Sequence, residues 1–280
     1  MIGEASAPAS SANLGPGFDT IALALGLRCT ATAEPAESMT LSEHGSTTRL
    51  PDHDLIAVVV KRVVGRPMHI TLDNQIPRAR GLGSSAAVGA SVAAAALKAA
   101  GSGGDRTMVF SIISEIEGHP DNAAAAVFGG LVAAVPEGIQ RLDLHESLLP
   151  VVGIPSTPLR TRDARAALCD VVTRDVIARS LGRLAFLIEG LSSGNASALA
   201  HASGDEIHEA PRAELSPVTG DLMKAAMDAG AVHACWSGAG PTALAFATAE
   251  TRGRVIGAMS GVLGNEGEVL ALRVDHDGLM

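Results

Sequence analysis

The stretch Pro77-Arg-Ala-Arg-Gly-Leu-Gly-Ser-Ser-Ala-Ala87 sets two glycines, Gly81 and Gly83, ahead of two serines and a long alanine- and valine-rich segment. Glycines let the backbone turn sharply and approach a ligand closely, and Ser84 or Ser85 can cap the helix that the segment predicts. The free N–H groups of a first helical turn and the helix dipole favour an anion. The stretch therefore predicts a phosphate-binding loop, with a structural strand-to-helix turn as the alternative.

Two common nucleotide-binding loops are excluded by the spacing of this stretch. No Lys-Ser or Lys-Thr pair follows the glycines, as a Walker loop requires. The G-x-G-x-x-G spacing of a dinucleotide fingerprint is not met either.

The composition narrows the class of protein. The chain has 280 residues and a net charge of −9, and no run of Lys or Arg indicates a nucleic-acid face or a membrane patch. Only 2% of the residues are aromatic, so Ala, Val, Leu and Ile must fill the core. Cys29, Cys169 and Cys235 lie far apart, which indicates neither a zinc site nor a disulfide framework. With no targeting or membrane-spanning pattern, we expect a cytoplasmic protein.

The order of the expected elements predicts an α+β fold with a boundary near residue 150. Strands are expected at 21–32, 39–42, 68–72, 129–135, 151–154, 232–236, 242–247 and 269–274. Helices are expected at 54–64, 84–100, 107–117, 121–127, 161–168, 171–189, 192–201, 217–229 and 251–263. The helix at 84–100 is apolar all round, which indicates that it is buried.

Three further motifs combine polar groups with glycine turns. Pro8–Asp19 (PASSANLGPGFD) reads as a loop when taken alone. Glu115–Asn122 (EIEGHPDN) gathers carboxylates whose oxygens suit Mg²⁺, or it is a polar helix end with Asp121 as its cap. Ser237–Thr242 (SGAGPT) reads as a tight hairpin turn between strands.

In this order the motifs resemble those of one family, the GHMP kinases (galactokinase, homoserine kinase, mevalonate kinase and phosphomevalonate kinase). Its three motifs are similar to Pro8–Asp19, Pro77–Ala87 and Ser237–Thr242. The segments SSANLGPGFD and EGHPDNAAAAVFGG most resemble the homoserine kinase subgroup. One departure is Asp121-Asn-Ala-Ala-Ala125, where the family usually has Asp-Asn-Val-Ala-Pro.

The resemblance implies a two-domain GHMP kinase fold. A ribosomal-protein-S5-like N-terminal domain, residues 1–150, would bind ATP, and a ferredoxin-like C-terminal domain, residues 151–280, would complete the substrate cleft. The implied reaction is ATP-dependent phosphorylation of the homoserine hydroxyl, on the route to threonine. ATP, Mg²⁺ and homoserine are the implied ligands, with no nucleic-acid or membrane partner. A homodimer is expected by analogy with the family.

The resemblance also assigns roles to residues. Nucleotide-binding residues would be Pro77, Arg78, Ala79, Arg80, Gly81, Leu82, Gly83, Ser84, Ser85, Ala86 and Ala87. The amino acid would be held by Asn13, Asp19, His119, Asp121, Asn122, Arg165 and Arg212, the arginines suiting a carboxylate because the guanidinium fork pairs with it. Mg²⁺ would take Ser84 or Ser85 with Glu117 or Glu115, and Ser237, Gly238 and Gly240 form the glycine-turn motif.

Asp121 is the catalytic candidate, because it would orient the homoserine hydroxyl. Phosphoryl transfer depends mainly on positioning and charge neutralisation, so a general base is left open. Another small-alcohol kinase of the family, of mevalonate or shikimate type, is the nearest alternative. A non-catalytic relative that uses the fold as a binding module is the alternative from another class.

Overall fold

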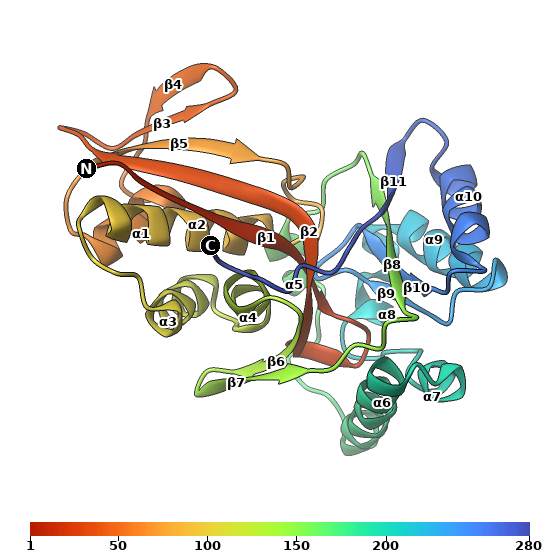
Figure 1. Ribbon diagram of the computed structural model, residues 1–280. Helices are drawn as coiled ribbons and strands as arrows, with labels where there is room; N and C mark the ends of the chain where they lie inside the picture. Colours follow the sequence, from red (N-terminus) through yellow and green to blue (C-terminus); the bar gives the residue numbers. More distant parts are fainter.

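The computed structural model describes residues 1–280 and contains two β-sheets with helices packed against each (Figure 1). The first sheet has the order β4-β3-β5-β2-β6-β7, and β1 pairs with β2 outside this path. Only β3 and β5 run parallel. Its strands are β1 (Gly3–Asn13), β2 (Gly17–Pro35), β3 (Thr40–Glu43), β4 (Ser46–Arg49), β5 (Met68–Asn74), β6 (Leu131–Val135) and β7 (Gly138–Leu142).

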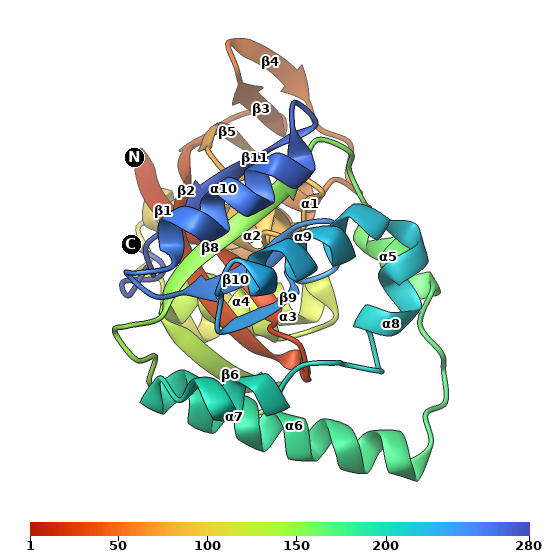
Figure 2. The ribbon, with the colours of Figure 1, turned by 90° about the vertical axis from the view of Figure 1, so that its right-hand side faces the viewer.

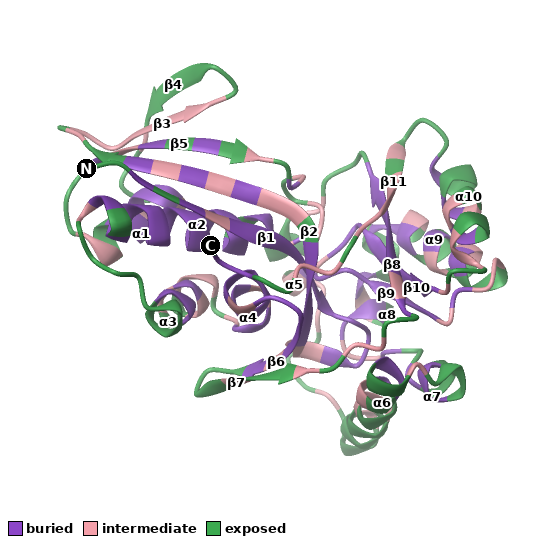
Figure 3. Ribbon diagram, in the orientation of Figure 1, coloured by how far each residue is buried: buried purple, intermediate pink, exposed green.

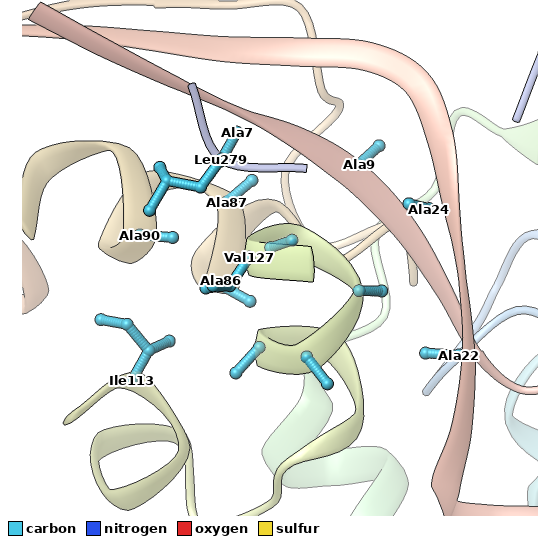
Figure 4. Close-up of a cluster of buried hydrophobic side chains, with 14 of the residues drawn as sticks. Ala7, Ala9, Ala22, Ala24, Ala86, Ala87, Ala90, Ile113, Val127 and Leu279 are labelled. Carbon is cyan, nitrogen blue, oxygen red and sulfur yellow. The ribbon is translucent and has the colours of Figure 1, made fainter. Parts of the chain in front are cut away.

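Four helices pack against this sheet, and the second of them contacts both β1 and β2 (Figure 1). They are α1 (Leu55–Val63), α2 (Ser84–Ala99), α3 (Arg106–Glu117) and α4 (Asp121–Phe128). Nearly every residue of α2 is buried, which confirms the prediction from its uniformly apolar sequence (Figure 3). Figure 4 shows that alanines of β1, β2 and α2 contribute to this core, so short side chains fill it in place of aromatic rings.

The second sheet is antiparallel throughout, in the order β11-β8-β10-β9. Its strands are β8 (Leu149–Pro155), β9 (His233–Trp236), β10 (Ala243–Ala247) and β11 (Gly267–Ala271), with α9 (Pro217–Asp228) and α10 (Arg252–Leu263) packed on it. The sequence β8-α9-β9-β10-α10-β11 is the βαββαβ arrangement of a ferredoxin-like fold. The α+β prediction is therefore confirmed.

A long connection between β8 and β9 holds the remaining helices. It contains α5 (Thr161–Ala166), α6 (Arg174–Ser193), α7 (Ala196–His201), α8 (Glu209–Arg212) and a 3-10 turn at Ala213–Leu215. Figure 2 shows α6 along one margin of the molecule, and most of its residues are exposed. The connection matters for function because α5 and α8 supply Arg165 and Arg212.

The structure corrects several element predictions. Pro8–Asp19 is not a free loop, because β1 runs to Asn13 and β2 begins at Gly17. The sequence does not reveal β1, since its last seven residues are all buried and show no alternation of apolar and polar side chains. The break predicted between the helices at 171–189 and 192–201 comes later in the chain, at Gly194. The positive φ of Gly194, 75°, ends α6, and Asn195 then caps α7. The short elements β4, β7 and α8 lack a pattern long enough to predict.

The chain crosses between the sheets more than once. The predicted division at residue 150 falls inside β8, and it stays a prediction. The last residues return to the first half, where Met280 exchanges backbone hydrogen bonds of 2.9 and 3.0 Å with Ser6. Leu279 is buried in the core between the first sheet and its helices (Figure 4). None of the helices has both the length and the hydropathy that crossing a bilayer requires.

Candidate active site

A cleft of about 400 Å³ gathers side chains from widely separated parts of the chain. Its lining includes Asn13, Asp19, the loop 77–85, Glu117, His119, Asp121, Asn122, Arg160, Thr161, Arg165, Arg212 and Gly238. Nearly all of the predicted site residues therefore lie together. Five do not line the cleft: Ala86 and Ala87 are fully buried in the core, Ser237 and Gly240 are buried behind the loop, and Glu115 is exposed elsewhere.

The loop before α2 is held in a conformation that only glycine adopts readily. Gly81 has φ +74° and Gly83 has φ +62°, in the left-handed region. A Cβ on Gly81 would overlap the carbonyl of Ser237, and one on Gly83 would overlap the Ser10 hydroxyl. The two glycines are thus required both by conformation and by close approach of the neighbouring chain.

The N-terminus of α2 has no side-chain cap, which corrects the expectation for the serines. Gly83 is the N-cap residue, and Ser84 is already helical. The Ser84 hydroxyl instead lies 3.4 Å from the carbonyl of Ile76 and 3.3 Å from Asn74 Nδ2. Because no side chain caps them, the first N–H groups of α2 remain free for an anion in the cleft.

Only one of the two candidate metal carboxylates faces the serines. The Ser85 hydroxyl donates to Glu117 Oε2 over 3.2 Å, whereas Glu115 pairs with Arg62 at 2.6 Å on the surface. Burial raises the pKa of Glu117, because desolvation disfavours the charged carboxylate when no cation is nearby. Residues two apart on a helix face different ways, and this separates the two glutamates.

Asp121 is almost fully buried at the first position of α4, and one of its oxygens collects three donors. Oδ1 lies 2.7 Å from His119 Nδ1, 2.7 Å from the Asn122 backbone N–H and 3.4 Å from Asn122 Nδ2. Asn122 Oδ1 in turn accepts from the Ser10 hydroxyl at 2.8 Å. Burial lowers the pKa of His119, but its hydrogen bond to Asp121 and the nearby carboxylates outweigh burial and raise that pKa overall.

Asn13 and Asp19 are fixed by hydrogen bonds close to His119 and Asp121. Asn13 Oδ1 accepts from the Asp19 backbone N–H at 3.0 Å, and its Nδ2 donates to the Gly238 carbonyl at 3.0 Å. Both residues have positive φ, 73° and 52°. Single ligand atoms of Asp19, His119 and Asp121 lie within 4.8 Å of one another, so this part of the cleft concentrates groups suited to a cation.

Two arginines also line the cleft. Arg165 pairs with Asp19 through two hydrogen bonds of 2.7 and 3.1 Å. Arg212 is almost fully buried, and the guanidinium carbons of both arginines lie 5.8 Å from the Phe18 ring. Burial and the neighbouring Arg165 lower the pKa of Arg212 to about 10, which leaves it charged at neutral pH.

The glycine turn between β9 and β10 ties the other loops together. The Ser237 hydroxyl donates to the Gly81 carbonyl at 2.7 Å, and the Gly238 N–H donates to Ala12 O at 2.9 Å. The hairpin reading of this motif is correct, since β9 and β10 are antiparallel neighbours. The turn also serves as the point at which the ends of β1 and the loop before α2 meet.

Comparison with known proteins agrees with this architecture. The family described as GHMP kinases N terminal domain matches residues 54–130, and the family described as GHMP kinases C terminal matches residues 187–264. The chain belongs to the GHMP kinase family. Its two-domain fold of mixed helices and strands is the fold of that family, as the sequence predicted, and its members use ATP.

Relatives within the GHMP kinases are similar over most of their length. A homoserine kinase from Thermus thermophilus is 38% identical over 277 residues, covering 95% of this chain and 94% of the relative. One from Moorella thermoacetica is 37% identical over 254 residues, covering 85% of each. A solved homoserine kinase from Cytophaga hutchinsonii superimposes with a TM-score of 0.88 at 23% identity, covering 100% of this chain and 96% of the other.

Some cleft residues escaped the sequence analysis. Arg160 and Thr161 precede Arg165 at the start of α5, and Asp54 caps α1 where that helix reaches the cleft. The Phe18 ring lies 5.8 Å from the guanidinium carbon of each arginine, and His208 contacts Arg212. Phe18 was the one of these residues that the sequence could have indicated, because it is an aromatic residue within the polar motif Pro8–Asp19 and aromatics are rare in this chain.

Proposed function

We propose that this protein phosphorylates the hydroxyl of L-homoserine with ATP, forming O-phospho-L-homoserine for threonine synthesis. The observation that carries the proposal is a single cleft lined by the glycine loop before α2, by carboxylates and by two arginines; these are Asp19, Glu117, Asp121, Arg165 and Arg212. Relatives named homoserine kinase, 32–38% identical to this chain, support the choice of amino acid.

ATP would lie with its phosphates against the loop 77–85. The uncapped N–H groups of α2 and the helix dipole favour the triphosphate, so the binding does not need a net positive protein. Arg80 is held by the carbonyls of Pro155 and Ser156, and Arg78 pairs with Glu43 at 2.7 Å. These side chains brace the loop against neighbouring segments, and the backbone is left to meet the phosphates.

Mg²⁺ would be held by Ser85 and Glu117, whose oxygens are the ligand type this ion prefers. The residues fit the ion, because the Ser85 hydroxyl and Glu117 Oε2 lie 3.2 Å apart and both residues line the cleft. The bound ion would neutralise charge on the transferring phosphoryl group. Ser84 is less suited, since its hydroxyl already contacts Ile76 and Asn74.

Homoserine would lie in the part of the cleft lined by Arg212, Asp19 and Asp121. Arg212 would pair with its carboxylate, Asp19 would meet its ammonium group, and Asn13 would hold Asp19 in place. The hydroxyl would then lie near Asp121, whose Oδ1 is fixed by His119 and Asn122. Holding the hydroxyl in line with the phosphoryl group supplies most of the acceleration expected for a loose transition state.

A coupled assay of ADP release tests the proposal with homoserine, mevalonate, shikimate and threonine as acceptors. We expect homoserine to give the highest kcat/KM and O-phosphohomoserine as the product by phosphorus NMR. Release of ADP with mevalonate and not homoserine would keep the kinase and reject the substrate. No stimulation by any acceptor would favour a binding module.

Two finer predictions accompany the function. We infer that the protein acts in the cytoplasm without a membrane or nucleic-acid partner, in keeping with its net charge of −9. We also expect a homodimer by analogy with the family. Light scattering of the purified protein gives its mass directly, and a value near the chain mass of 28.3 kDa would reject the dimer.

A further inference from the structure

His208 lies directly behind Arg212 and has no exposed surface. Its Nε2 is 2.7 Å from the Gly15 carbonyl, and its Nδ1 is 3.2 Å from Arg212 Nη1. A carbonyl can only accept, so Nε2 must carry the proton, and Nδ1 is then free to accept from the guanidinium. The two contacts together select one neutral tautomer.

The surroundings of His208 favour that neutral ring. Burial, aided by the charge of Arg212, lowers the pKa of His208 against the opposing effect of Asp205. The Phe18 ring stacks on it with centroids 5.5 Å apart. Asp205 Oδ2 accepts from the backbone N–H groups of His208 and Glu209 at 2.6 and 3.0 Å, which fixes the start of α8.

The contacts of Arg212 leave a specific part of its guanidinium for a ligand. Nε donates to Ala164 O at 3.2 Å, and Nη1 donates to Gly238 O at 3.1 Å as well as to His208. These bonds use three of the five N–H donors, including both of Nη1. Only Nη2 has no partner within the protein, while Arg212 lines the cleft.

We propose that His208 is a positioning residue for the amino-acid substrate. By accepting from Arg212 Nη1 it holds the guanidinium plane, so that the two N–H groups of Nη2 are presented to the substrate carboxylate. His208 also fastens the Gly15 turn, which leads into Phe18 and Asp19 on the same wall of the cleft. The inference rests on the proposed function, because it takes Arg212 as the carboxylate-binding group.

Three substitutions separate the contacts of His208. In His208→Asn the amide oxygen lies where Nδ1 accepts from Arg212, in His208→Gln the longer amide reaches toward Gly15, and in His208→Ala both contacts are lost. We expect His208→Ala and His208→Gln to raise the KM for homoserine about tenfold, the effect of one lost hydrogen bond to a charged group. We expect His208→Asn to restore most of the affinity, and the KM for ATP to stay unchanged in all three.

His233 provides a matched control. It is also a fully buried histidine, and its Nε2 contacts Leu14 O at 3.1 Å in the same turn, but it has no contact with Arg212. His233→Ala should therefore lower stability without raising the KM for homoserine relative to that for ATP. Equal increases in His233→Ala and His208→Ala, or equal increases in the Asn and Ala variants of His208, would overturn the proposal.

A second measurement does not depend on the substrate. Nitrogen-15 NMR of labelled wild-type protein should show His208 as the neutral ring with its proton on Nε2, and the proton on Nδ1 would overturn the inference. If His208→Ala does not fold, the comparison of Asn with Gln decides. If the wild-type protein does not phosphorylate homoserine but His208 shows the expected tautomer, the proposed function is rejected and the arrangement of His208 still holds.

Discussion

Asp121 illustrates how much one carboxylate is shaped by its neighbours. It lies at the first position of α4, where the helix dipole favours negative charge, and its Oδ1 accepts from His119 and Asn122. Those donors hold the carboxylate in one orientation. The arrangement suits a group that positions a substrate hydroxyl.

Asp121→Asn tests that role. The amide oxygen can keep the contacts of Oδ1, so the fold should survive, but the negative charge beside the hydroxyl is lost. We expect kcat to fall by about 10²-fold, the low end of what proton-transfer groups contribute, with the affinity for ATP unchanged in calorimetry. Unchanged turnover would remove Asp121 from the mechanism.

Glu209 is a buried carboxylic acid outside the cleft. Burial raises its pKa to about 8, against the hydrogen bond of 2.8 Å that its Oε1 accepts from the Trp236 N–H. The folded protein therefore keeps a proton on Glu209 at neutral pH, whereas the unfolded chain releases it above pH 4.5. Between these values the unfolded state binds fewer protons, so the free energy of unfolding falls as the pH rises.

Glu209→Gln should remove this pH dependence, because the amide keeps the Trp236 contact and never ionises. We expect the variant to gain stability relative to wild type by an amount on the order of a few kcal/mol between pH 5 and pH 8.5. Urea unfolding at a series of pH values measures the difference. A constant gap between the two proteins across that range would contradict the assignment.

At the scale of an element, the loop before α2 joins three chain segments. Ala79 O accepts from the Leu159 N–H at 3.1 Å, Gly81 O accepts from Ser237, and Leu82 O accepts from the Ser10 N–H at 3.1 Å. The loop therefore contacts both sheets and the end of β1. Its shape depends on glycines that leave no room for a side chain.

Gly81→Ala should displace this loop. The new Cβ would overlap Ser237 O while the residue keeps a left-handed φ, so the phosphate-binding N–H groups must move. We expect kcat/KM for ATP to fall about 10²-fold, the effect typical of a displacement near 1 Å. Steady-state kinetics with ATP varied at saturating homoserine measures it.

Gly101 is the matched control for that variant. It has φ +80°, but a Cβ there would have nothing within 4 Å. Gly101→Ala should therefore cost only about 1 kcal/mol of stability from the left-handed backbone and leave kcat/KM for ATP unchanged. Similar kinetics for the two alanine variants would show that close approach at Gly81 is unimportant.

At the scale of the whole molecule, the C-terminal residues fasten the second half of the chain to the first. Arg28 of β2 contacts Asp275, Ser6 O and Gly278 O. Leu279 donates its N–H to Val127 O of α4 at 3.0 Å and is only 5% exposed. The tail thus supports the helix whose other end carries Asp121.

Leu279→Ala should leave a cavity between β1 and α4. We expect a loss of about 2 to 5 kcal/mol in the free energy of unfolding, as for other buried leucines, measured by urea denaturation. Met280→Ala is the control, because Met280 is 52% exposed and its contacts with Ser6 are through the backbone. Equal losses in both variants would show that the leucine side chain contributes nothing specific.

The sequence alone determined the features that arise from local chemistry. The glycine pair, the serines and the apolar segment after them were enough to predict the loop and the buried helix α2, because φ preference and hydrophobic periodicity act over a few residues. The motifs that carry the family resemblance were visible for the same reason. The short or fully buried strands were not, since β1 shows no alternation where both of its faces are covered.

Only the tertiary structure decided which of these groups meet. It placed Glu117 beside Ser85 and Glu115 on the surface beside Arg62, and it paired Arg165 with Asp19 across 146 positions of sequence. It also set His208 behind Arg212 and against Gly15, 193 positions away in the chain. Such contacts depend on how two sheets and a long connection pack together, and no local pattern of residue types records that packing.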